Sequence, residues 1–87
     1  MERARQKLAE LTSRRVTLAN GERAYEFRLE HDSEPPHWLY VSHELIEKHG
    51  EQGLLDRLGE VVPHLTTVGQ SLRVTLTSNR VRAEPAD

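Results

Sequence analysis

Histidine is the residue type in this chain with the widest chemical range, because its imidazole ring binds metal ions and exchanges protons near neutral pH. The chain has five: His31, His37, His43, His49 and His64. His43 and Glu47 lie four positions apart, so on a helix they would share one face. His31, Asp32 and His37 share one short polar segment. Neither spacing is specific for a metal centre, so we predict solvated histidines and no bound metal.

Catalytic nucleophiles and phosphate-binding loops are not indicated by the sequence. The chain has no cysteine, which excludes thiol catalysis, disulfides and thiolate zinc sites. Its serines lack the Gly-x-Ser-x-Gly context of a nucleophile elbow, and Ser42 is better explained as a helix cap. Gly50, Gly53 and Gly59 lack the spacing of a loop that cradles phosphate. We therefore predict a protein that is not an enzyme and carries no cofactor.

Charged residues divide the chain into regions of opposite sign. The formal net charge is −2, yet bases outnumber acids in residues 1–15 and acids outnumber bases in residues 16–60. Basic ends of one copy could meet the acidic middle of another, which suits self-association. The bases that could instead hold phosphates are Arg3, Arg5 and Lys7 near the start and Arg73, Arg80 and Arg82 near the end. The net acidic charge, and a basic face expected to lack aromatic side chains, make nucleic acid the less favoured ligand.

Trp38 and Tyr40 are the candidate anchors for a protein partner. On an extended strand they point to one face, whereas Leu39 and Val41 point to the other. A core on one side of the sheet can accept only one of these pairs, and the sequence leaves open which one. Trp and Tyr are favoured at interfaces because they bury a large area at low entropic cost. The predicted partner surface consists of Trp38, Tyr40, Glu44, Glu47 and Glu51.

The N-terminal half shows patterns of one helix and three strands. Apolar residues at helical spacing predict an amphipathic helix over residues 1–12. Asn20-Gly21 is a strong hairpin signal that would pair Val16 with Tyr25. A polar loop that contains two prolines, residues 31–37, then leads to a short third strand.

The C-terminal half is predicted to be helical first and extended later. Ser42 is a suitable N-cap for helices over residues 43–68, with breaks expected at His49-Gly50 and just before Pro63. Residues 65–68 could alternatively form a strand. A hairpin with Ser78-Asn79 at its tip would pair Leu76 with Val81 and Val74 with Ala83, although a single bent strand is the alternative.

These patterns predict one small α+β domain, residues 1–87. Its antiparallel sheet would combine a meander, residues 14–41, with a C-terminal strand or hairpin, residues 71–83, and helices 43–68 would pack on one face. Residues 84–87 are expected to form a frayed tail, and the strand order stays open. The predicted core is Val16, Leu18, Tyr25, Phe27, Leu29, Ile46, Leu54, Leu58, Val62, Leu65, Leu72, Val74 and Leu76.

For function, the sequence favours a small intracellular, cytoplasmic protein-interaction module without catalysis. It would act as an adaptor, modulator or inhibitor of a larger assembly, or pair with itself as a homodimer. The alternative is a nucleic-acid-binding module that uses the basic outer face of the C-terminal strands and the N-terminal helix. No membrane segment is predicted, because the apolar run 38–41 is far shorter than the ~20 residues that a span needs.

Overall fold

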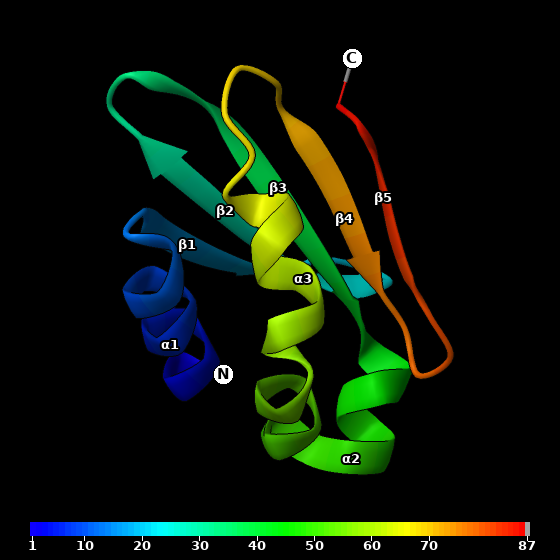
Figure 1. Cartoon of the computed structure of the whole chain (residues 1–87). Coiled ribbons are helices and arrows are strands. Elements are labelled where there is room, and N and C mark those ends of the chain that lie inside the picture. The colour runs from blue at the N-terminus through cyan, green and yellow to red at the C-terminus, as the bar shows by residue number, and fades with distance from the viewer. Residues whose placement is uncertain (87) are drawn as a thin grey trace.

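The computed structural model describes residues 1–86 and shows one α+β domain with a layer of helices on one face of a sheet (Figure 1). In chain order the elements are α1 (Glu2–Thr12), β1 (Arg15–Asn20), β2 (Ala24–His31), β3 (Glu34–Ser42), α2 (His43–Asp56), α3 (Leu58–Leu65), β4 (Leu72–Leu76) and β5 (Val81–Pro85). The strands lie in the order β1-β2-β3-β4-β5, so β3 is the central strand. None of the helices within the described part of the chain combines the length and apolar character of a membrane span.

The hairpin of β1 and β2 forms, but the predicted pairing of Val16 with Tyr25 is wrong. Val16 pairs with Leu29 instead, and Asn20 pairs with Tyr25, so the loop is longer than a two-residue turn. Glycine suits position 21, because a Cβ there would make a tight contact of 3.0 Å with the carbonyl oxygen of Ala24. Relative to the prediction, the partner of each β1 residue lies an even number of positions further along β2. Side chains on a strand alternate between the two faces, so every side chain keeps its predicted face.

The third strand is longer than predicted, and the polar loop over residues 31–37 is mostly extended. β2 continues to His31 and β3 already begins at Glu34. Pro35-Pro36 fits because the β2–β3 register shifts here, and because pairing with β4 begins only at Trp38. Neither edge of β3 therefore needs the backbone N–H groups that the prolines lack.

The sheet is not purely antiparallel, because β3 and β4 run parallel. A parallel pair needs a crossover connection, and α2 and α3 supply it on the covered face. The C-terminal hairpin is confirmed, with Leu76 opposite Val81 and Val74 opposite Ala83.

The expected frayed tail, residues 84–87, is largely wrong. β5 extends to Pro85, and the N–H of Ala86 donates to the carbonyl oxygen of Ser71 over 3.1 Å. Pro85 is tolerated because β5 is an edge strand. Asp87 lies outside the described residues.

The helical segment differs from the prediction mainly in where it breaks. The hydroxyl of Ser42 caps α2 by accepting the N–H of Leu45 over 3.2 Å, as predicted. The break predicted at His49-Gly50 is confirmed, because Gly50 has φ 68° and kinks α2, a conformation that glycine adopts without strain. The break predicted just before Pro63 is wrong, because the helices separate at Arg57 and Pro63 lies inside α3. Since α3 ends at Leu65, residues 66–68 are neither helix nor strand.

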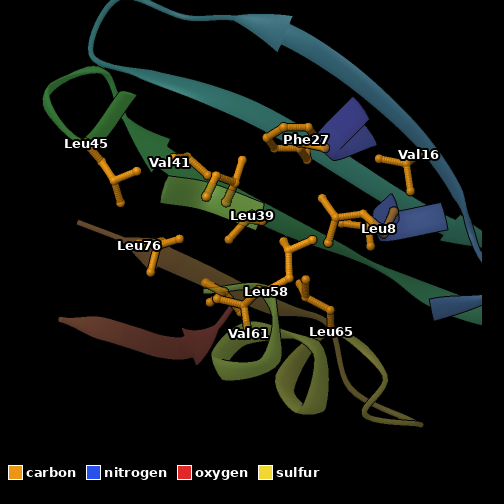
Figure 2. Close-up of a cluster of buried hydrophobic side chains, with 14 residues drawn as sticks. Leu8, Val16, Phe27, Leu39, Val41, Leu45, Leu58, Val61, Leu65 and Leu76 are labelled. Atoms are coloured by element: carbon orange, nitrogen blue, oxygen red, sulfur yellow. The ribbon is translucent and has the colours of Figure 1, made fainter. Parts of the chain in front are cut away.

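The core lies between the sheet and all three helices (Figure 2). Val16, Phe27, Leu29, Leu54, Leu58, Leu65, Val74 and Leu76 are buried as predicted, whereas Leu18, Tyr25, Ile46, Val62 and Leu72 are only partly buried. The prediction missed Ala4, Leu8, Leu39, Val41, Leu45 and Val61. Leu39 and Val41 are fully buried on β3, so Trp38 and Tyr40 point away from the helices.

Candidate functional site

The face of the sheet that the helices leave uncovered, here called the open face, carries Trp38 and Tyr40 at its centre. Strand register places its side chains in two rows across the sheet. The Trp38 row contains Thr17, Arg28, Trp38, Arg73 and Glu84. The Tyr40 row contains Ala19, Glu26, Tyr40, Thr75 and Arg82.

Trp38 is half-buried because arginines from both neighbouring strands flank it. The guanidinium carbon of Arg28 lies 5.8 Å from the centre of the indole ring, within range of a cation–π interaction. On the other side, Arg73 donates from Nη2 to the carbonyl oxygen of Ala86 over 2.8 Å. These contacts restrict the side chains of Arg28 and Arg73 on either side of Trp38.

The charges of the open face alternate in sign. Arg28 Nε lies 3.5 Å from Glu30 Oε1, and Arg82 Nη2 lies 3.6 Å from Glu84 Oε2. Burial raises the pKa of the Tyr40 hydroxyl above its usual value, nearby Glu26 raises it further, and Arg73 opposes the shift. Tyr40 therefore stays neutral near pH 7 and presents a hydroxyl donor. Aromatic residues and Arg are the types that are enriched at protein interfaces relative to the rest of the surface.

The basic residues predicted from the sequence do not form one surface. Arg73 and Arg82 lie on the open face, Arg80 lies in the exposed turn before β5, and the N-terminal bases lie on α1. Arg5 is already engaged, because it pairs with Glu2 and donates to the carbonyl oxygen of Val16 over 3.2 Å. The expectation that the basic face lacks aromatic side chains is wrong, since Trp38 and Tyr40 lie between the arginines.

The acidic residues of the predicted partner surface lie on α2, apart from the aromatic pair. Glu44 and Glu47 are exposed, but Glu51 is partly buried. Glu51 Oε2 accepts the N–H of Ala4 over 2.9 Å and lies 3.5 Å from the N-terminal amine. This hydrogen bond makes Glu51 a cap for the start of α1, and it also lowers the pKa of the Glu51 carboxyl.

Replacement of Glu51 by alanine is expected to lower the free energy of unfolding by about 0.5–2 kcal/mol, because the N–H of Ala4 loses its acceptor. Urea denaturation near neutral pH measures the effect. Glu47→Ala is the matched control, since Glu47 is an exposed carboxylate on the same helix and should change stability by less than about 0.5 kcal/mol. Equal effects of the two variants would contradict the capping role.

The histidines are tied to separate parts of the fold. His43 Nε2 lies 2.8 Å from Asn20 Oδ1, and its ring meets Tyr25 edge-on at 4.9 Å between centres. The prediction of solvated histidines is wrong for His37, which is fully buried, whereas His31 is exposed and contacts Ser33. Within residues 1–86, no three side chains of the types that bind metals converge on one point.

One surface hollow gathers residue types that could do hydrolytic chemistry. His49, Asp56 and Ser78 line it, with Leu45 and Arg57, and its volume is about 220 Å³. The hydroxyl of Ser78 donates to Glu44 Oε1 over 3.3 Å, and no hydrogen bond within the described chain joins Ser78 to His49. A catalytic serine is activated by a hydrogen bond to its base, whereas the Ser78 hydroxyl is engaged with Glu44.

Sequence reasoning placed Glu26 and Arg28 on the solvent side of the hairpin but missed them as site residues. The alternation of β2 places these two side chains on one face, and that face becomes a candidate site only once the sheet is known to be uncovered on that side.

The chain matches no model of a known protein family, no curated protein and no solved structure in the comparisons made.

Proposed function

We propose that this protein is a non-catalytic protein-interaction module that docks through its open face. The supporting observation is that Trp38 and Tyr40 project from the central strand between arginines, on the side that α1, α2 and α3 do not cover (Figure 1). Trp, Tyr and Arg are the residue types that contribute most to binding at protein interfaces. Buried aromatic anchors surrounded by charged pairs provide both affinity and orientation.

A reducing, cytoplasmic setting is part of the same proposal. The chain has no cysteine, so its stability depends on the hydrophobic core and the sheet rather than on disulfides. An adaptor or modulator of a larger assembly fits a domain of this size, because its open face presents an aromatic pair and several arginines across a five-stranded sheet.

Site-specific photo-crosslinking in cells of the native source tests this proposal. With p-azidophenylalanine in place of Tyr40, a nearly isosteric change, we expect covalent protein adducts, which could include a second copy of this chain. The same probe in place of Lys48, an exposed residue on α2, serves as the matched control and should give few adducts. Trp38→Ala should reduce the adducts at position 40 at least tenfold, the equivalent of about 1.4 kcal/mol. Adducts at position 48 but not at position 40 would contradict the proposal.

Single-stranded nucleic acid is the second candidate, favoured by the position of the aromatic pair between Arg28, Arg73 and Arg82. Bases stack on aromatic rings while arginines contact phosphates, and both chemistries meet on the open face. Binding of a fluorescent oligonucleotide should then weaken as salt rises, and Arg73→Ala should reduce the slope of this dependence. Lys7→Ala on α1 is the control. Binding that is insensitive to salt would exclude this candidate.

A further inference from the structure

We propose that the partner of the open face is a second copy of this chain, stacked face to face about a twofold axis. The axis runs across the strands, midway between the Trp38 row and the Tyr40 row. This inference rests on the proposed function, because it names the partner that the open face would bind. It is carried by the pattern of charges that strand register imposes on the two rows.

Rotation about this axis exchanges the two rows while each strand stays above its own counterpart. The Trp38 row of one protomer therefore meets the Tyr40 row of the other, and β3 lies above β3 in the opposite direction. Trp38 then faces the partner's Tyr40, and the aromatic pairs form the centre of the interface. Two sheets that pack face to face lie about 10 Å apart, a gap that side chains of this size fill from both sides.

The same rotation brings charges of opposite sign together at both flanks. On β2, Arg28 faces the partner's Glu26, because these residues belong to different rows of the same strand. On β5, Glu84 faces the partner's Arg82 for the same reason. Symmetry repeats each contact, so charge pairs surround the aromatic centre on both sides.

The other twofold arrangement of two stacked sheets has its axis along β3, and the charges oppose it. That rotation exchanges β2 with β4 and keeps each row above itself. Arg28 would then face the partner's Arg73, since both flank Trp38 in one row. Like charges in contact at an interface are strongly unfavourable, so the open face selects the axis that crosses the strands.

The size of the open face indicates a reversible dimer. It spans five strands. Strands lie about 4.8 Å apart and rise about 3.3 Å per residue, so the open face measures roughly 20 Å across the five strands and roughly 17 Å along about five residues of each strand. Such a footprint, about 340 Å² on each protomer, lies well below the ~800 Å² per partner of a standard specific interface, which corresponds to weak association. We therefore expect an equilibrium between monomer and dimer that depends on protein concentration.

Charge exchange within β2 tests the proposed axis. Sedimentation equilibrium of the full chain from about 1 µM to about 500 µM should show dimerisation. Arg28→Glu and Glu26→Arg should each weaken it at least tenfold, because each places like charges across the interface, an effect of about 1.4 kcal/mol. The double variant R28E/E26R should dimerise more tightly than either single variant, since opposite charges face each other again, although the contacts of Arg28 with Trp38 and Glu30 are not restored.

Lys48→Glu on α2 makes the same charge change away from the open face and should leave dimerisation unchanged. Thermal unfolding of every variant shows whether it is folded. If a β2 variant does not fold, the same test is made on β5. R82E alone should weaken dimerisation, and the double variant R82E/E84R should restore it.

A chain that stays monomeric over the whole range, or a double variant no better than the single ones, would overturn the inference. The proposed function is judged separately. If the chain stays monomeric and the probe at position 40 cross-links to a different protein, docking through the open face is supported and the second copy is rejected as the partner. Cross-links confined to position 48 would reject both.

Discussion

Replacement of Phe27 by alanine is expected to lower the free energy of unfolding by about 3–5 kcal/mol, a large part of the stability of a domain this small. Phe27 is fully buried on β2, between Leu18 of β1 and Leu39 of β3. Loss of the ring removes buried apolar surface and leaves a cavity at the centre of the layer between sheet and helices. Urea denaturation followed by far-UV circular dichroism measures the change.

Arg28→Ala is the matched control for Phe27→Ala, because Arg28 is the next residue on β2 and points to the open face. It should change stability by less than about 0.5 kcal/mol, since its ion pair with Glu30 is exposed. An unchanged melting temperature for Phe27→Ala, or a larger loss for Arg28→Ala, would mean that the two faces of the sheet are assigned the wrong way round.

Replacement of His37 by alanine is expected to cost about 2–5 kcal/mol, because a buried ring and its two partly buried hydrogen bonds are lost together. His37 Nδ1 accepts the N–H of Leu72 over 3.0 Å, so this nitrogen carries no proton. His37 Nε2 then carries the proton and donates to the carbonyl oxygen of Thr67 over 2.8 Å. These bonds fasten the segment between α3 and β4 onto β3, and denaturant unfolding measures their loss.

Stability is also expected to fall in mild acid through His37. Burial lowers the pKa of its imidazole below the usual 6.5, and the positive charge of nearby Arg14 lowers this pKa further. The hydrogen bond to Thr67 and the negative charge of Glu34 raise the pKa and oppose the shift. Because the unfolded chain then takes up the proton more readily than the folded one, the contribution is complete above pH 6.5 and is lost as the pH falls below it. The slope from this single group is at most about 1.4 kcal/mol per pH unit.

His37→Gln isolates this pH dependence, because an amide can donate and accept hydrogen bonds but does not titrate. Unfolding free energies at about pH 7.5 and about pH 5 should differ less for this variant than for the original chain. His64→Gln, which changes a histidine outside the core on α3, serves as the control and should keep the original pH dependence. If His37→Gln keeps the full loss in acid, His37 is not its source.

Alternation and end signals in the sequence determined most of the local structure. The first helix, the cap at Ser42 and the pairing of Leu76 with Val81 are confirmed residue by residue. The two faces of β2 are also as predicted, although its pairing with β1 is not. A period of two residues assigns side chains to faces whatever the register, whereas the register depends on the loop that closes around Gly21.

Only the tertiary structure decided which pair of β3 residues is buried and which is presented. Trp38-Leu39-Tyr40-Val41 is apolar on both sides, so local alternation carries no information about its orientation. The covering helices settle it, because α2 and α3 return the chain along one face and bring β4 parallel to β3 with Leu39 and Val41 inside. The open face exists because the crossover lies on a single side, and no pattern within β3 itself encodes that choice.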